Sequence, residues 1–338
     1  MKSILRKQLT LWTLVVLVLS GCHNGDEPAD QEKTLDHLIF EEICYSGTIK
    51  KRVYESEIYT YPYEHDYYIK ITNPTKDILY LDGMGLAMSA LNAANLVTLK
   101  DGTDIRETHF GAGILMRFPG RPGEKNHPVQ PGGSVFLAEV AVNHTQKPDE
   151  DSDYWTWNED SYDLSKVDFE WATPKEIEEA DEFPDNPNVP NLILAFPRTR
   201  AIKSMISEGS AIALINIPAE LTDDILFDPS DKNPYKWNTS WTSHDTGDGH
   251  GHGGKMIEYL KFPNEMVIDA VQLCSQKDYK WSVVTGVDAG YASIYDFESA
   301  EFVVRSLYRK HDGVKFVDDD NSTTDFEVRP ASLAIKAE

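Results

Sequence analysis

The stretch DYYIKITNPTKDILYLDGMGLAMS, residues 66–89, decides the fold that the sequence predicts. From Tyr67 to Thr72 two sets of side chains alternate, which is the two-residue period of a strand. Asn73–Asp77 predicts a turn, because its proline pre-sets the backbone and its Asn and Asp side chains form local hydrogen bonds. The apolar run Gly83–Met88 supplies the next strand, with glycines that permit a bend. We therefore predict a strand–turn–strand hairpin at the centre of the fold.

Short apolar runs separated by turn residues recur along the chain and predict further strands. These runs span residues 38–47, 96–99, 111–117, 134–142, 192–196, 210–217, 256–261, 267–274 and 302–310. Residues 48–65 are expected to connect the first run to the central hairpin. Because the strands are evenly spaced and amphipathic helices are rare, we expect an all-β fold, a β-sandwich over residues 37–330.

Two segments interrupt this rhythm and are expected to be loop-rich insertions lying on the sandwich. Residues 144–191 are acidic and rich in Trp, Tyr and Pro. Within them, residues 174–181 predict one short helix that begins with a proline. Residues 218–255 contain a loop of histidines and glycines. Residues 331–338 are expected to be a C-terminal tail.

The N-terminus predicts a targeting segment. Three basic residues precede an apolar stretch that is too short to span a bilayer, whose core needs roughly 20 residues. The stretch ends in Leu-Ser-Gly-Cys, which resembles a bacterial lipobox. Residues 1–21 are therefore expected to be a lipoprotein signal peptide, with Cys22 as the lipidated residue. The alternative is an ordinary cleaved signal with a chance cysteine.

Residues 22–36 are polar and are expected to be a flexible tether. Each buried methylene contributes about 0.8 kcal/mol, so two or three acyl chains on Cys22 would hold the protein on a membrane. Asp26 and Glu27 resemble the acidic export signals of Bacteroidota surface lipoproteins. We expect an outer-membrane lipoprotein exposed on the cell surface, and a domain facing the periplasm is the alternative.

The charge of the chain disfavours nucleic acid as a partner. The chain has 56 acidic and 32 basic residues, a formal net charge of −24. Such a surface repels the phosphates of polynucleotides and anionic lipid head groups. It is compatible with basic partners or divalent cations.

Two family resemblances rest on these stretches. Y-I-x-I-x-N-P at residues 68–74, followed by L-D-G at 81–83, resembles the lamin-tail family, whose similar stretch occupies two strands of an immunoglobulin-type sandwich. Further stretches resemble DUF4876, a family of uncharacterised Bacteroidota lipoproteins related to the lamin-tail sandwich. They lie at residues 163–171, 185–191, 267–273 and 309–328. Over roughly residues 38–330, this resemblance implies the fold and the location and carries no catalytic residues.

The densest group of metal-capable side chains lies in the loop at residues 244–254, which departs from the family pattern. His244, His250 and His252 offer imidazole nitrogens to zinc, nickel or copper. A mobile loop with weak affinity is the alternative, because ordering each residue costs on the order of 1–2 kcal/mol. No metal or other cofactor is expected to be resident. The acidic runs at 228–233 and 318–321 lack the EF-hand spacing and are expected to be solvated turns.

Trp155, Trp157, Trp237 and Trp241 fall in the two insertions. Exposed tryptophans beside acidic groups are typical platforms for sugar rings. The alternative is that these side chains pack the insertions onto the sandwich.

Cys44 and Cys274 lie in predicted strands, where cysteine most often packs as a small apolar group. Whether they form a disulfide is left open by the sequence.

No catalytic motif for acyl transfer, metalloproteolysis, phosphate binding or dithiol redox chemistry is present. We expect a non-enzymatic, membrane-anchored surface lipoprotein that binds a ligand or partner, because loops on a rigid scaffold usually carry binding. An outer-membrane receptor, a host glycan and a host protein are the expected partner classes. One alternative is a hydrolase acting on glycans or protein, since carboxylate pairs cannot be located from sequence spacing. Another is a metal-capturing lipoprotein that uses the histidine loop.

Overall fold

The computed structural model describes residues 35–54, 56–100, 102–147, 157–170, 185–196, 205–222, 225, 233–243, 257–296 and 304–334. In these ranges β-strands are the predominant regular secondary structure. The helical elements that lie wholly within them have three or four residues, such as α3, Ser322–Asp325. No helix in this part of the chain is long and apolar enough to cross a membrane.

The first large sheet has the strand order β11-β10-β4-β1-β18-β19. Its neighbouring strands are antiparallel, except that β10 and β11 are parallel. The bounds are β1 Ile39–Cys44, β4 Tyr68–Thr72, β10 Ser134–Ala138, β11 Phe169–Glu170, β18 Arg305–Arg309 and β19 Phe326–Pro330. The first insertion therefore contributes an edge strand, β11, to this sheet.

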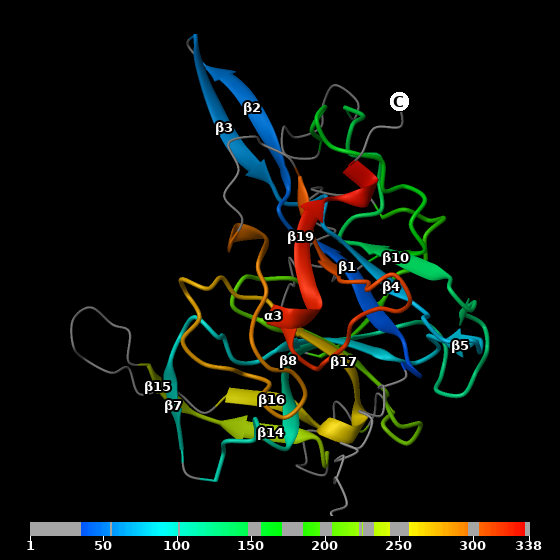
Figure 1. Ribbon diagram of the computed structural model, residues 1–338, viewed down its shortest axis with the longest axis vertical. Helices are drawn as coiled ribbons and strands as arrows, with labels where there is room; N and C mark the ends of the chain where they lie inside the picture. Colours follow the sequence, from blue (N-terminus) through cyan, green and yellow to red (C-terminus); the bar gives the residue numbers. More distant parts are fainter. Residues whose placement is uncertain are drawn as a thin grey trace, which may run out of the picture. The chain divides into compact units, whose positions relative to one another are not determined.

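The second large sheet has the order β14-β16-β8-β6-β13-β17, with β12 paired to β8. Its strands are β6 Gly85–Ser89, β8 His109–Arg117, β12 Ile193–Phe196, β13 Ala211–Ile215, β14 Lys236–Thr239, β16 Ile257–Pro263 and β17 Val267–Gln272. Two-stranded pairs complete the fold, as Figure 1 shows. They are β2 Thr48–Tyr54 with β3 Glu57–Tyr63, β5 Leu79–Tyr80 with β9 Pro128–Val129, and β7 Val97–Leu99 with β15 Trp241–Ser243.

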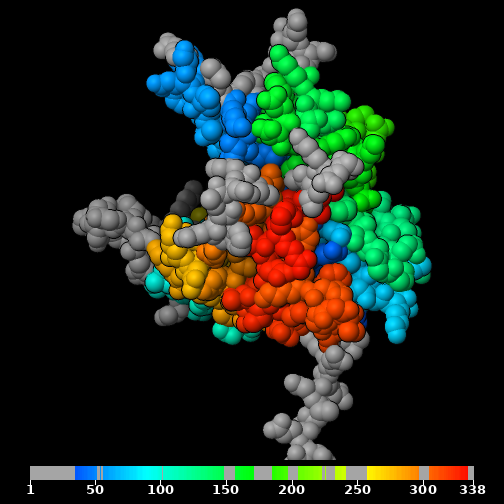
Figure 2. Space-filling model, turned by 45° about the horizontal axis from the view of Figure 1, so that its top comes forward, coloured from blue at the N-terminus to red at the C-terminus, as the bar shows by residue number. Residues whose placement is uncertain are grey.

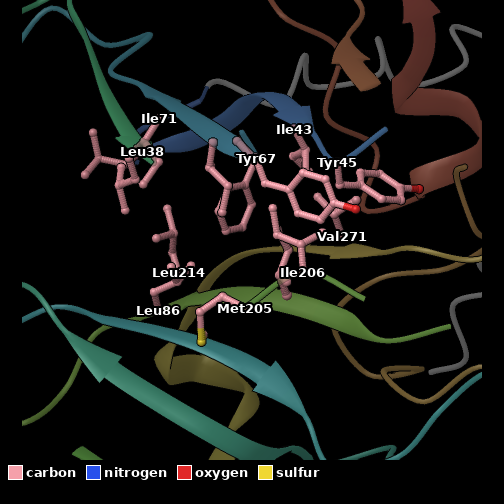
Figure 3. Packing of buried hydrophobic residues seen from close by; sticks show 14 of the residues in the cluster. Leu38, Ile43, Tyr45, Tyr67, Ile71, Leu86, Met205, Ile206, Leu214 and Val271 are labelled. Atoms are coloured by element: carbon pink, nitrogen blue, oxygen red, sulfur yellow. The ribbon is translucent and has the colours of Figure 1, made fainter. Parts of the chain in front are cut away.

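The two large sheets enclose the main hydrophobic core. Three side chains on the side of the first sheet point across this core toward three side chains of the second sheet (Figure 3). They are Ile43, Tyr67 and Ile71 on the first side and Leu86, Leu214 and Val271 on the second. A second cluster covers the other face of the second sheet, and a third lies on the other face of the first sheet around Cys44, Tyr68 and Leu164. The all-β sandwich is therefore confirmed, and parts of both outer faces are buried as well.

The predicted strands at both ends of residues 66–89 are confirmed, but the predicted hairpin is wrong. β4 belongs to the first sheet and β6 to the second, so the chain crosses between the sheets here. The Asp82 carboxylate holds this crossing in place by accepting hydrogen bonds from the backbone N–H groups of Asn126 (3.0 Å) and His127 (2.9 Å). Gly83 follows with φ +71°, where a side chain would meet Pro122. These contacts turn the connection out of hairpin geometry.

A buried ion cluster joins the two sheets. Arg309 of β18 donates two hydrogen bonds of 2.7 Å to Asp269 of β17, and its Nη1 donates to Asp318 at 3.1 Å. The backbone of Phe40 in β1 takes part twice, since its N–H donates to Asp269 and its C=O accepts from Arg309 Nε. Burial opposes the charged guanidinium, but the carboxylates of Asp269, Asp318 and Asp325 outweigh it and raise the pKa of Arg309.

We expect Leu86→Ala to lower the free energy of unfolding by about 2–5 kcal/mol, because Leu86 is fully buried and its truncation leaves a cavity. Val314→Ala is the matched control, since Val314 is 88% exposed, and it should change stability by about 0.5 kcal/mol or less. Chemical denaturation of both variants measures the difference. Equal effects would contradict the assignment of the core.

Candidate functional site

The β2–β3 hairpin is exposed along most of β3. The two strands pair antiparallel from Thr48–Tyr63 to Tyr54–Glu57, joined by the two-residue connection at positions 55 and 56. Ser56 has φ +74°, which a tight hairpin connection requires. Figures 1 and 2 show the hairpin standing out from the sheets, beside residues of the first insertion.

Large apolar side chains line this hairpin without being covered by the described part of the chain. Ile58 is 68% exposed, Tyr54 54% and Tyr59 42%. By the register, Tyr54 and Tyr59 share one face and Ile58 lies on the other. An isolated two-stranded hairpin is at best marginally stable in water. Exposed aromatic and aliphatic groups on such an element indicate a contact surface.

A buried polar network fastens the base of the hairpin to the first insertion. Asp66 Oδ2 accepts hydrogen bonds from Thr48 Oγ1 (2.7 Å) and Ser161 Oγ (2.6 Å). Asn158 Nδ2 donates to the same Thr48 hydroxyl at 2.7 Å. The three side chains of Thr48, Asp66 and Asn158 are almost fully buried. Hydrogen bonding of this kind fixes the direction in which the hairpin leaves the sandwich.

Lys50 adds a second fastening on the same side. Its Nζ donates to the backbone C=O of Trp157 and lies 5.0 Å from the centroid of the Trp157 ring. The same ammonium lies 5.8 Å from the ring of Tyr63, at the end of β3. The lysine is thereby buried between the hairpin and the insertion.

The prediction that residues 48–65 form a connection is wrong, because they contain β2 and β3. A signal was present, because tyrosines 59, 61 and 63 recur at every second residue, the period of a strand. The charged residues of this stretch concealed it, since charged side chains are uncommon in strands that are packed on both faces.

The structure separates the four tryptophan candidates. Trp237 belongs to β14, a strand of the second sheet, and is buried there, with its indole N–H donating to the C=O of Thr103 at 3.0 Å. Trp157 is half-buried beneath Lys50. Trp241 begins β15, and Trp155 lies outside the described residues.

The candidates Cys22, His244, His250 and His252 lie outside the described residues, as does the predicted helix at 174–181. In the part of the chain that is described, no group of three or more His, Cys, Asp or Glu side chains is arranged to hold a metal ion. Cys44 and Cys274 are buried and not bonded to each other. Burial raises the pKa of each thiol to about 12, so both behave as packing groups.

An acid-lined cavity lies beside the ion cluster. Its volume is about 300 Å³, and its wall includes Asp269, Asp288, Asp318 and Asp320. Asp318 is buried and bound to Arg309, so the expectation of a solvated turn at 318–321 is wrong for this residue. Asp288 accepts from the N–H and the hydroxyl of Ser322 and from the N–H of Gln272. Asp318 therefore fastens the loop before α3 to β18 of the first sheet, and Asp288 links the first residue of α3 to β17 of the second sheet.

A pH experiment tests the network at the hairpin base. Burial raises the pKa of Asp66 from 3.8 to about 6, although the Ser161 and Thr48 hydroxyls oppose the shift. A carboxyl group with a higher pKa in the folded chain keeps its proton longer when folded, so its contribution to stability falls as pH rises through that range. The unfolding free energy of the wild type, relative to Asp66→Asn, should fall between about pH 4 and pH 6 and then level off.

The control for this experiment is Asp77→Asn, at an exposed carboxylate for which burial is not a factor. Denaturant titrations at several pH values measure all three proteins. The assignment of a raised pKa to Asp66 would be contradicted if the unfolding free energy of the wild type, relative to that of Asp66→Asn, rose with pH.

Comparison with known proteins gives the family. The model of DUF4876, described as a protein of unknown function, matches residues 130–332, which is more than half of the chain. A crystal structure of a DUF4876 family protein from Bacteroides thetaiotaomicron is similar, with a TM-score of 0.58 and 21% identity over 87% of this chain and 71% of that chain. At this identity the likeness concerns the fold alone. No curated protein matches. From the family match, this chain belongs to the DUF4876 family.

Proposed function

We propose that the protein is a membrane-anchored surface lipoprotein that acts as a non-enzymatic binding module, and that the β2–β3 hairpin is its contact element. The observation that carries the proposal is the exposure of Tyr54, Ile58 and Tyr59 on an element that projects from the sheets. Tyrosine side chains bring a large contact area and one hydroxyl group, and tyrosine is enriched in binding hot spots. The expected partners remain an outer-membrane receptor, a host glycan or a host protein.

The fastening at the hairpin base supports binding in a second way. Ordering a loop or a flexible segment on association costs free energy that is subtracted from the affinity. Asp66, Thr48 and Asn158 already fix the base through buried hydrogen bonds. The hairpin therefore enters a complex with part of this ordering cost already met by folding.

The anchor is tested by Cys22→Ser. We expect the wild-type protein to partition with membranes or into the detergent phase, because acyl chains on Cys22 bring many buried methylenes. The variant should remain in the aqueous phase. Detergent partitioning followed by immunodetection measures this, and a wild-type chain found only in the aqueous phase would remove the anchor from the proposal.

The contact element is tested by the double variant Ile58→Ser/Tyr59→Ser on glycan and host-protein arrays. Ligands retained by the wild-type chain should bind the variant about tenfold or more weakly, since two exposed apolar groups are lost. Ile193→Ser is the control, because Ile193 is 43% exposed on β12, away from the hairpin.

Retention of every ligand by the double variant would show that binding lies elsewhere on the molecule. Loss of binding in the Ile193→Ser control to the same degree would show that the effect is not specific to the hairpin.

A further inference from the structure

We propose that the cavity beside β17 binds a short, extended peptide segment that carries a lysine or an arginine. This inference goes beyond the proposed function, because it concerns a second binding site that shares no residue with the β2–β3 hairpin. It is carried by the position of the cavity at the edge of a sheet, by the backbone groups that face it and by the acceptors and charges of its wall.

The cavity lies at the edge of the second sheet. β17 is the last strand of that sheet and, among the described strands, pairs with β13 alone. The wall is formed by residues 267–270 of β17 together with Asn264, by residues 285–289, and by Asp318 and Asp320 of the loop before α3. Its volume of about 300 Å³ is at the lower end of the range for ligand pockets and about ten times the volume of one water molecule.

One residue of β17 presents its backbone to this cavity. The N–H of Leu273 donates to the C=O of Ser210, on the side of β13, whereas the N–H of Gln272 donates to the cavity residue Asp288 at 3.1 Å. Because these directions alternate along a strand, the N–H and C=O of Ala270 point to the same side as those of Gln272. Ala270 lines the cavity. An extended segment in the cavity can therefore exchange two main-chain hydrogen bonds with Ala270, as an added strand does.

The wall also contains a buried acceptor that lacks a donor. Asn264 Nδ2 donates to the backbone C=O groups of Glu107 (3.0 Å) and Gly286 (3.1 Å), which fixes the side-chain amide. Its Oδ1 is buried and accepts no hydrogen bond from the described part of the chain. A buried acceptor without a partner is costly, so the cavity favours a ligand that donates hydrogen bonds.

Charge adds a preference for a cation. The lining residues include no Lys, Arg or His, and the acidic ones are Asp269, Asp288, Asp318 and Asp320. The bonds that these aspartates make do not neutralise them as a set, because Arg309 shares one positive charge among three carboxylates. Burial, together with the charge of Asp269, raises the pKa of Asp288 to about 7. A cation in the cavity would reduce this repulsion, whereas an acidic ligand would increase it.

Two other occupants fit the cavity less well. A single metal ion is much smaller than the cavity, and no group of three His, Cys, Asp or Glu side chains in the described ranges is arranged to hold one. The described chain begins close to the cavity, since His37 Nε2 lies 3.5 Å from Asp318 Oδ2. Residues 22–34 could reach it, but they contain four acidic residues and one lysine and would bring negative charge to an acidic wall.

The test uses the full chain and tripeptides blocked at both ends, in which the central residue stands between two valines that favour an extended backbone. In isothermal titration calorimetry, the peptides with a central lysine or arginine should bind about tenfold or more tightly than the one with glutamine. The lysine peptide should bind more weakly at high salt. Its N-methylated form, which cannot donate main-chain hydrogen bonds, should bind about tenfold or more weakly.

Variants of the wall locate the site. Asp320→Asn removes one charge from an exposed wall residue and should weaken binding of the lysine peptide about threefold or more. Asp319→Asn is the matched control, because it makes the same change at the neighbouring exposed residue, which does not line the cavity. The double variant Ile58→Ser/Tyr59→Ser should bind the peptide as the wild type does, so failure of the hairpin proposal and failure of this one are distinguishable.

Amide hydrogen exchange reads the backbone contact directly. On addition of the lysine peptide, the amide of Ala270 should become protected, while the amide of Val271, which faces β13, should change little. Absence of binding, equal affinity for the lysine and glutamine peptides, full binding of the N-methylated peptide, or protection of Ala270 before any peptide is added would each overturn the proposal. Preference for the basic peptides, weakening by Asp320→Asn but not by Asp319→Asn, and new protection at Ala270 together support it.

Discussion

Arg309 is a buried cation that links the two sheets. It meets a carboxylate of β17 through two hydrogen bonds, a carboxylate of the loop before α3, and the backbone of β1. Its side chain is almost fully buried, so removing Arg309 would leave the buried Asp269 carboxylate without the cation to which it is bonded. Burial of the hydrophobic core holds the two sheets together. The ion cluster fixes which strands of the two sheets stand opposite one another.

The same principle operates at the opposite end of the first sheet. There the Asp66 carboxylate accepts hydrogen bonds from Thr48 of the hairpin and from Ser161 of the first insertion. A buried polar group is costly unless it is hydrogen-bonded, so such a network tolerates few arrangements of its members. One buried cation and one buried carboxylate thus define the geometry that the apolar contacts alone would leave open. The hydrogen bonds of Asp66 fix the direction in which the exposed hairpin leaves the sandwich.

Much of the fold follows from local sequence, and the rest depends on contacts between distant residues. The apolar runs at 38–47, 134–142 and 210–217 became β1, β10 and β13, because period and turn residues are local signals. The pairing of β4 and β6 was predicted wrongly, since the Asp82 contacts that turn the crossing involve residues 126 and 127. Arg309 and Asp269 are 40 positions apart, and no spacing in the sequence indicates that they meet. The hairpin was missed although its tyrosine alternation was visible.

The place of β1 in its sheet has a consequence for how the chain reaches its native state. β1 pairs with β18, so that Glu42 stands opposite Tyr308, and the first sheet stays incomplete until nearly the whole polypeptide is available. Closing so large a loop costs entropy before any contact repays it, and topologies rich in distant pairings fold slowly. A chain built in this way cannot complete its first sheet while its C-terminal part is still being synthesised. Its two sheets become a finished structure only when the last strands arrive.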